Sequence, residues 1–341
     1  MNVSIHKTVE KLKKGDNKAN MNYTWQDGRD QGAKLVQEPP RLSKGGEESL
    51  LRIITLNVNN ENAATPEGFV CEAILILTPD GKTMLIDASW PSDFVHPNGK
   101  EPSYGTNLIL SFLRQRGIST IDWMMASHIH DDHIGGMPEI LLSEDVEVKA
   151  FLWSPVPDEK LLEAERWAPI YIKMVQEIRE GCAKKKIPMI EVKQAEMFDL
   201  GDGVFGDVLS VAEPELEVPN YINNNSIVTR LTYKDFSMML AGDSGFEQED
   251  RIMALGKDLT SDVLKIGHHA GAGSTSEAWA KAVNAKVGVA SMPRGLSVNN
   301  PNGERVYNQL KATSMEIYRT WEYGHIEIQT DGTQYWVITE R

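Results

Sequence analysis

The sequence predicts a layered α/β protein, and three observations lead to this prediction. Short apolar runs rich in β-branched residues recur along the chain, bounded by turn residues. Segments with helical spacing of apolar residues lie between these runs in both halves of the chain. No repeat of fixed period is present. Strands that alternate with helices are typical of layered α/β folds.

The composition is that of a globular protein without an export signal. The chain has 341 residues, of which 41% are hydrophobic and 25% charged, which is enough for one large domain or two modest ones. We find no apolar run of transmembrane length and no apolar segment of a secretory signal near the N-terminus. Cys71 and Cys182 are too few for a disulfide framework. We therefore expect a cytoplasmic protein with no membrane partner.

The charge balance argues against one class of partner. The formal net charge is −14 at pH 7, whereas a protein that grips a long nucleic acid carries clustered Lys and Arg. We expect no strong nucleic-acid-binding patch, and a small molecule or a short phosphodiester as substrate. The oligomeric state and the physiological substrate stay open at this stage.

Two domain boundaries are predicted. Residues 1–48 are polar and show no sustained period, so we expect a polar N-terminal extension there. Residues 49–341 should form one domain, with a helical insertion at about 155–200. Within this insertion, Pro169 should break or kink the helix near Ala168.

In the first half of the domain, a hairpin, a helix and a strand are predicted to precede a cluster of polar residues. Strands are expected at 50–58 and 69–77, and the Pro-Asp-Gly turn at 79–81 joins the second to a third strand, "KTMLIDAS". The helical segment "TNLILSFLRQRGI" should stop at Gly117. A short strand, "STIDWMMAS", then leads directly into the cluster.

The second half alternates strands with helices. After the cluster, "IGGMPEILL" should start a helix and "VKAFLWS" a strand, and further helices are expected at about 247–255, 275–283 and 303–312. The strands expected in this half are "GDVLSVAEP", "SIVTRLTYKD", "FSMMLAGD", "DVLKIGHH", "AKVGVAS", "SMEIYRT", "HIEIQT" and "TQYWVIT".

The cluster itself is the stretch "SHIHDDHIGG", residues 127–136. It packs three of the chain's eight histidines and two aspartates between His128 and His133. In a loop that leaves a strand, alternate side chains share one side, so His128 and His130 can bind one metal ion. Asp132 and His133 then turn toward a second ion. Imidazole together with carboxylate suits Zn, Mn or Fe, and a polar loop without function is the weaker interpretation.

Two later strands end on residues that can complete such a centre. "MMLAGDSG" ends its strand on Asp243, whose carboxylate can bridge two cations. "DVLKIGHHAGAGS" ends on His268 and His269. We favour His268 as the ligand because it comes first off the strand, and His269 is the alternative that lines the pocket. Catalytic roles are predicted for Asp132, His133 and Asp243.

At this point the sequence resembles a known family. HxHxDH, followed by a strand-ending Asp and a strand-ending His, resembles the metallo-β-lactamase superfamily. The stretches "EAILILTPDGKTMLIDAS", "SHIHDDHIGG", "NNNSIVTRLTYKDFSMMLAGD", "DVLKIGHH" and "MEIYRTWEYGHIEIQTDG" resemble its ComEC-like branch, the β-lactamase-like domains of DNA-uptake competence proteins. The resemblance covers roughly residues 50–340. It implies a four-layer αβ/βα sandwich with two divalent metal ions, Zn or Mn, at one edge.

One family feature is missing from this chain. Most hydrolytic members supply a further His between the first cluster and the bridging Asp, but no histidine lies between His133 and His268 here. "NNNS" stands at the matching place, so Asn224, Asn225 and Ser226 are candidate ligands or substrate-binding residues. A plain Asn-rich turn is the equal alternative. The resemblance thus implies that the metal site of His128 and His130 has harder ligands and binds its ion more weakly, so that Mn can compete with Zn there.

The ligand set and the resemblance imply hydrolysis by a metal-bound hydroxide. ComEC-like domains are thought to be nucleases or phosphodiesterases, so phosphodiester hydrolysis is the first hypothesis, with Ser274 as a candidate donor to phosphate oxygens. Hydrolysis of a lactone, thioester or β-lactam is the alternative, as is a metal-binding scaffold without turnover. Asp87 is expected to orient one imidazole from behind, Asp131 to be solvated, and His325 to be structural or at the pocket rim.

Overall fold

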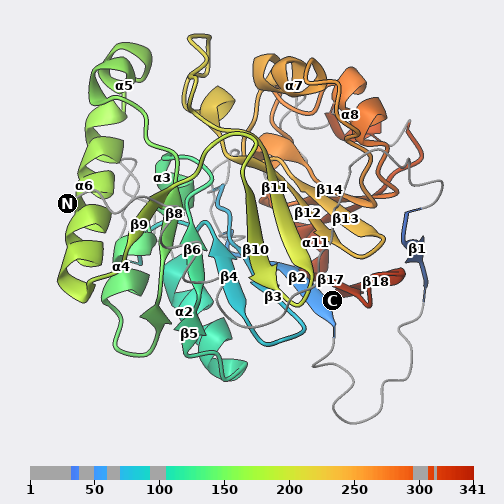
Figure 1. The fold of residues 1–341 in the computed structure, drawn as a ribbon, viewed down its shortest axis with the longest axis horizontal. Coiled ribbons are helices and arrows are strands. Elements are labelled where there is room, and N and C mark those ends of the chain that lie inside the picture. Colours follow the sequence, from blue (N-terminus) through green and yellow to red (C-terminus); the bar gives the residue numbers. More distant parts are fainter. Residues whose placement is uncertain (1–31, 38–49, 60–69, 93–104, 295–305, 311–312) are drawn as a thin grey trace, which may run out of the picture. The chain divides into compact units, whose positions relative to one another are not determined.

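Two β-sheets organise the chain, and helices cover their outer faces (Figure 1). The computed structural model describes residues 32–37, 50–59, 70–92, 105–294, 306–310 and 313–341. These residues belong to one unit that begins at Gly32, and residues 1–31 fall in a second unit outside the described part. No helix in the described ranges is both long and apolar enough to cross a membrane.

The larger sheet is mixed and has nine strands in the described residues. Its order is β1 (Lys34–Leu35), β18 (Gln334–Thr339), β17 (Ile326–Thr330), β2 (Leu51–Thr55), β3 (Ile74–Leu77), β4 (Thr83–Ile86), β6 (Trp123–Met125), β8 (Phe151–Trp153) and β9 (Met189–Glu191). The pairs β4–β6, β6–β8 and β8–β9 are parallel. The predicted hairpin is confirmed, because β3 and β4 pair antiparallel.

The smaller sheet has seven strands in the same described ranges. Its order is β10 (Met197–Gly201), β11 (Val204–Ser210), β12 (Val228–Tyr233), β13 (Phe236–Leu240), β14 (Val263–Lys265), β15 (Val287–Ala290) and β16 (Glu316–Arg319). The pairs from β13 to β16 are parallel. A short parallel pair, β5 (Thr120–Ile121) with β7 (Glu147–Val148), stands apart from both sheets.

The sheets pack face to face because their strands are apolar on both sides. In β3, Ile74 and Ile76 belong to a buried cluster that also contains Met238 and Val263 of the smaller sheet. Leu75, between the two isoleucines, belongs instead to the cluster under the helices. Successive strand residues point to opposite faces, so each strand contributes to two cores at once.

Helices cover both outer faces, which confirms the predicted αβ/βα sandwich. The larger sheet carries α2 (Gly105–Gln115), α4 (Met137–Leu142) and α6 (Ala168–Lys185), whose apolar residues share a core with β3 and β6. The smaller sheet carries α7 (Phe246–Met253) and α8 (Glu277–Val283). Figure 1 shows α6 and α8 on opposite sides of the strands. Shorter helices in the described residues include α3 (Asp131–Ile134), α5 (Asp158–Ala164), α11 (Thr320–Tyr323) and the 3₁₀ turns η2 (Asn223–Asn225) and η3 (Gly267–Ala270).

The expected helical insertion at 155–200 is shorter than predicted. Helix α5 ends at Ala164 and α6 begins at Ala168, so the predicted break at Pro169 is confirmed. Pro169 is tolerated in the first turn of α6, where its missing N–H would have no helical partner. Helix α6 ends at Lys185, and β9 and β10 follow it. The strand segments here are short and half-exposed, which weakened their apolar pattern.

Part of the predicted extension at 1–48 contributes to the larger sheet. Strand β1 pairs parallel with β18, and Ala33 is buried beside it. Residues 1–31 and 38–48 lie outside the described residues. The predicted helix at 303–312 is described only at 306–310, which are helical.

Truncation can test the contribution of β1. The truncation that lacks residues 1–31 is the reference, because it keeps the unit that begins at Gly32. Deleting residues 1–37 should lower the free energy of unfolding by about 1–3 kcal/mol relative to this reference, since two backbone hydrogen bonds, from the N–H groups of Lys34 and Val36, are lost. Urea unfolding followed by circular dichroism measures both. Equal stability of the two truncations would contradict a stabilising role for β1.

Candidate metal centre

The predicted ligands lie at strand ends that meet at one edge of the sandwich. In the larger sheet, Asp87 follows β4 and His128 follows β6, and these neighbouring strands are parallel. In the smaller sheet, Asp243 follows β13 and His268 follows β14, which are also parallel neighbours. The carboxyl ends of parallel strands lie at the same edge of a sheet, where ligands commonly bind in open α/β folds. The N–H of Ile227 donates to the carbonyl of Ser127 over 2.7 Å and joins the two edges.

A close backbone approach fixes the loop that carries the histidine cluster. The N–H of Ala88, just after β4, donates to the carbonyl of His133 over 2.7 Å. A Cβ on Gly136 would lie 2.2 Å from both the carbonyl oxygen of Ala88 and the hydroxyl of Thr106. Any larger residue would therefore push α3 away from the strand ends, which explains the "GG" of the motif.

The Asp243 carboxylate lies at the middle of the centre. Its Oδ2 is 3.3 Å from His133 Nε2, 3.5 Å from His269 Nε2, 3.8 Å from His128 Nε2 and 4.0 Å from His268 Nε2. The Oδ1 atom is buried and has no hydrogen-bond partner. One carboxylate thus faces four imidazoles and keeps one oxygen free.

Two ligand sets surround this carboxylate. The first set contains His128 and His130, with His128 Nε2 and His130 Nδ1 only 3.0 Å apart. In the second set, His269 Nε2 is 3.2 Å from His133 Nε2 and 3.3 Å from Asp132 Oδ2. Ring nitrogens this close need a proton or a cation between them. Imidazole nitrogens with carboxylate oxygens are the donors that zinc prefers, so the residues fit divalent metal ions.

The structure places His269, rather than the favoured His268, with Asp132 and His133. His268, His269 and Ala270 all have positive φ angles of 46°, 50° and 61°. This left-handed backbone turns the second imidazole inward, so that the side chain of His269 is 3% exposed and that of His268 is 36% exposed. Such a conformation costs roughly 1–2 kcal/mol per residue for side chains other than Gly. Backbone strain of this kind persists where the surrounding packing holds the strained conformation in place, which is common at functional sites.

The predicted role of Asp87 is confirmed. Its Oδ2 lies 2.8 Å from His133 Nδ1, and it accepts hydrogen bonds from the backbone and hydroxyl of Ser127. The carboxylate therefore holds the Nδ1 proton of His133 and leaves Nε2 free to bind a metal ion. The carbonyl of Ser291, 2.8 Å from His269 Nδ1, does the same for His269.

The carboxylates around the second ligand set favour a cation there, whereas the imidazoles of the first set, His128 and His130, are kept neutral. Burial alone would lower the pKa of His133, but Asp243, Asp132 and Asp87 outweigh it and raise that pKa well above its usual value. Burial and the neighbouring imidazoles lower the pKa of His128, and burial lowers that of His130 to about 4. Neutral imidazoles offer their lone pairs to a metal at pH 7.

Three of the candidate ligands or substrate-binding residues have other roles. The side chain of Asn224 accepts from the N–H of Gln248 and donates to the carbonyl of Pro219. The side chain of Asn225 bonds the backbone of Leu216. Ser274 donates to the carbonyls of Gly267 and Gly271 and so braces η3. These groups are engaged by the backbone and are not available as ligands.

Ser226 and Asp131 also differ from their expected roles. The hydroxyl of Ser226 accepts from the N–H of Asp243 over 3.3 Å, so it supports the bridging residue from behind. Asp131 is half-buried rather than solvated, and burial together with Asp132 raises its pKa to about 7. His325 has the structural role that was one of its two expected roles, since its Nδ1 accepts from the N–H of Asn57 and its ring packs against Phe112.

Two buried charged residues were not predicted. Lys265, in β14, is fully buried, and its Nζ lies 2.5 Å from Glu72 Oε2. Glu72 Oε2 is in turn 3.8 Å from His269 Nδ1. Burial raises the pKa of Glu72, an effect that Lys265 opposes. A Lys inside the apolar strand "DVLKI" was the available signal, because a buried ammonium requires a buried partner.

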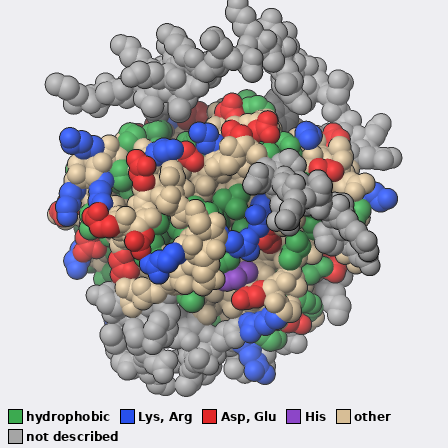
Figure 2. Space-filling view, turned by 90° about the horizontal axis from the view of Figure 1, so that it is seen from below, with side chains coloured by type: hydrophobic (Ala, Val, Ile, Leu, Met, Phe, Trp, Pro, Cys, Tyr) green, Lys and Arg blue, Asp and Glu red, His purple; other side chains and the backbone are tan. Residues whose placement is uncertain are grey.

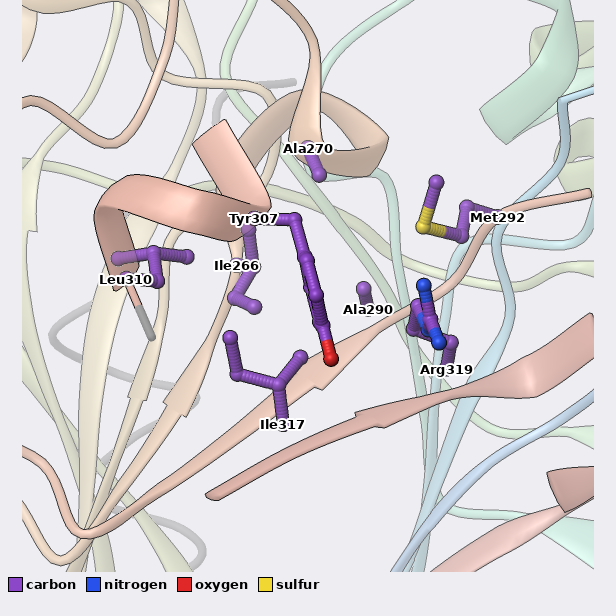
Figure 3. A pocket seen from close by; sticks show the side chains of 8 residues that line it. All are labelled: Ile266, Ala270, Ala290, Met292, Tyr307, Leu310, Ile317 and Arg319. Carbon is purple, nitrogen blue, oxygen red and sulfur yellow. The ribbon is translucent and has the colours of Figure 1, made fainter. Parts of the chain in front are cut away.

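A small apolar cavity lies beside the η3 turn (Figure 3). Ala270 points from the turn toward it, and the other lining side chains are Ile266, Ala290, Met292, Tyr307, Leu310, Ile317 and Arg319. No residue of either ligand set lines this cavity. It belongs to the packing that supports the turn and is not the metal centre.

Comparison with known proteins gives a family match over the part of the chain that carries the histidine cluster. Residues 67–152, which contain the histidine cluster, match the metallo-beta-lactamase superfamily. Over 230 residues, or 66% of this chain, the sequence is 30% identical to ComE operon protein 3 of Bacillus subtilis (strain 168). Over 106 residues, or 31% of the chain, it is 26% identical to Endoribonuclease ysh1 of Schizosaccharomyces pombe. The matched regions cover only 26% and 12% of these relatives.

Solved structures with a similar arrangement include Igni18, a metallo hydrolase from the archaeon Ignicoccus hospitalis. It is 13% identical, with a TM-score of 0.45, over 81% of this chain and 98% of that one. A diphosphatase from the PhnP family is 14% identical, with a TM-score of 0.42, over 78% of this chain and 94% of that one.

Asp87→Asn should weaken zinc binding by about 10- to 100-fold, because the amide no longer fixes the His133 tautomer. Competition with a chromophoric chelator measures the affinity, and circular dichroism checks the fold. Asp122→Asn is the matched control, since Asp122 is also buried but bonds Thr83 and Lys149 away from the centre. Similar zinc affinities for the two variants would contradict the role of Asp87.

Lys265→Met should destabilise the metal-free protein by about 3–5 kcal/mol, because it leaves the Glu72 carboxylate buried without its partner. The double variant Glu72→Gln/Lys265→Met should recover most of this loss. Urea unfolding in the presence of a chelator gives the three free energies. Additive effects of the two substitutions would show that the residues do not act as a pair.

Proposed function

The chain belongs to the metallo-β-lactamase superfamily of hydrolases and to its ComEC-like branch, and from that premise we propose that it cleaves phosphodiester-type substrates with two divalent cations. The observation that carries this proposal is the convergence of four imidazoles on Asp243 Oδ2, with Asp132 beside them. A centre of this kind serves hydrolysis, in which water must be activated near neutral pH.

Each part of the centre has a chemical task. His128 and His130 would hold one cation, Asp132, His133 and His269 the other, and Asp243 would be shared. When bound, such cations lower the pKa of water and polarise the substrate oxygen. Asp132 is the ligand side chain whose carboxylate reaches toward solvent, with 17% of it exposed. It can therefore orient the attacking water.

One unpartnered polar group supports an oxygen-rich substrate. The hydroxyl of Ser244, which directly follows the bridging Asp243, is buried and has no hydrogen-bond partner. Hydroxyl groups donate to the non-bridging oxygens of a phosphodiester. A relative named as an endoribonuclease also supports this bond class, since such enzymes act on a phosphodiester backbone.

The aromatic residues of β8 and of the α5–α6 segment give less support to an apolar carbonyl substrate. Trp153 and Tyr171 are buried in the core under the larger sheet. Tyr171 meets the centre only through its ring, which packs edge-on against His130 with centroids 5.1 Å apart. Trp167 is exposed. These side chains do not line an open apolar wall.

A short substrate fits the surface charge better than a long nucleic acid. The net charge is −14, and on the face drawn in Figure 2 basic and acidic side chains are interspersed. A long polyanion binds through many clustered Lys and Arg contacts. We propose a small phosphodiester or the end of a short oligonucleotide as the substrate.

Turnover of bis(p-nitrophenyl) phosphate tests this function. The protein is stripped of metal and refilled in parallel with Zn²⁺ and with Mn²⁺. We expect metal-dependent turnover that Asp132→Ala lowers by about 100-fold or more without loss of the fold by circular dichroism. His325→Gln is the control, because His325 lies outside the centre and Gln keeps an acceptor for Asn57; it should keep most activity.

A p-nitrophenyl ester and a lactone are assayed alongside. Hydrolysis of these carbonyl substrates without phosphodiester turnover would replace the proposed substrate class. Stoichiometric metal binding with no turnover of any of them would contradict the enzyme and favour a metal-binding scaffold.

A further inference from the structure

The first ligand set lacks a residue that completes it. His128 and His130 supply two imidazoles, and Asp243 is shared with the second set. No histidine lies between His133 and His268 in the sequence. The Asn-rich turn at the matching place offers only Asn223, because the side chains of Asn224 and Asn225 are engaged by backbone groups.

His268 and His269 are adjacent in sequence but turn their rings to different neighbours. Their ring centroids are 6.3 Å apart, with 63° between the ring planes. His269 Nε2 lies against Asp132 and His133. His268 Nε2 instead lies 3.3 Å from Asn223 Nδ2, and 4.0 Å from Asp243 Oδ2.

We infer that this histidine pair is divided between the two cations. His268 supplies the third imidazole of the first set, beside His128 and His130, and His269 completes the second set with Asp132 and His133. The inference deepens the proposed function, since it rests on the same two-cation centre. It gives the first cation a nitrogen-rich environment although the usual histidine of the family is missing.

Asn223 provides independent support for a ligand at this position. It is 5% exposed, and its Oδ1 has no hydrogen-bond partner. In the structure the Nδ2 group, and not the unpartnered oxygen, lies beside His268 Nε2. The oxygen and nitrogen of an amide exchange places by a 180° rotation, and after that rotation the oxygen would be a further ligand for a cation at His268.

The left-handed backbone explains how neighbouring residues serve two cations. In a regular strand, His268 and His269 would point to opposite faces of the sheet, and only one could reach the centre. With φ angles of 46° and 50°, both rings turn toward Asp243. The N–H of His268 donates to the carbonyl of Gly242 over 3.2 Å, which ties the turn to the loop that carries Asp243.

The donor set also predicts the metal. Three imidazoles and one carboxylate are softer than two imidazoles, an amide and water, and imidazole-rich sites favour zinc over manganese. The first site should therefore prefer Zn²⁺, in contrast to the harder set that the sequence implied.

Zinc titration of single and double variants tests the division. His268→Asn and His269→Asn form the matched pair, because Asn tolerates the left-handed backbone and lacks the imidazole. The full-length, metal-free protein is titrated with Zn²⁺ against a chromophoric chelator. Each substitution is made in His130→Ala, which removes the first set, and in Asp132→Ala, which removes the second.

In the Asp132→Ala background, His268→Asn should weaken the remaining zinc site by about 100-fold or more, and His269→Asn should change it little. In the His130→Ala background the two effects should be reversed. The opposite pattern, or a His268→Asn variant that keeps zinc affinity in both backgrounds, would overturn the inference.

Two further measurements keep the test decisive. If His268→Asn fails to fold by circular dichroism, Asn223→Ala is titrated in the same two backgrounds; it should weaken zinc binding only where the first set is intact. In the Asp132→Ala background, which keeps only the first set, bound Co²⁺ should show the d–d absorption bands of a nitrogen-rich site; adding His268→Asn should weaken these bands, and adding His269→Asn should leave them unchanged. Because these readouts do not depend on turnover, an inactive protein that shows this pattern would contradict the proposed function and leave the division standing.

Discussion

The structure of the centre depends on one shared oxygen, Asp243 Oδ2. Four imidazoles lie within 4.0 Å of it, and they come from two loops that follow strands of different sheets. Such an arrangement requires the two sheet edges to be held in register. The Ser127 to Ile227 hydrogen bond and the core between the sheets provide that constraint. A shift of either sheet would separate the ligands, so the packing of the whole sandwich serves this geometry.

Much of the fold could be predicted because the strands are apolar and the turns carry clear signals. Ile74, Leu75 and Ile76 have the pattern of a strand. Pro169 predicts a break near Ala168, and the structure has that break, with Pro169 in the first turn of α6. The strands at 189–191 and 197–201 were missed because they are short and half-exposed. Their strand conformation is imposed by neighbours at the sheet edges, which no local pattern reports.

The centre was predictable where sequence spacing sets geometry and unpredictable where backbone conformation does. The ligand spacing from His128 to His133 and the carboxylate at Asp87 follow from loops that leave adjacent parallel strands. The choice between His268 and His269 depends on a left-handed turn through a His-His-Ala sequence, in which no Gly signals positive φ. Asn224 and Asn225 resemble ligands in sequence but bond nearby backbone groups, as Asn side chains commonly do.

The buried charges explain why the centre calls for cations. The carboxylates of Glu72, Asp87, Asp132 and Asp243 lie among the imidazoles, and the only ammonium in contact with them among the described residues is that of Lys265. Lys265 lies against Glu72, and Asp87 is committed to Ser127 and His133. Asp132 and Asp243 therefore face histidine rings, and these rings carry positive charge only when they are protonated. Divalent cations bound to Asp132 and Asp243 would balance the negative charge of these carboxylates without protonation of the ligands. The Glu72 carboxylate does not compete for the cations, because Lys265 already neutralises it.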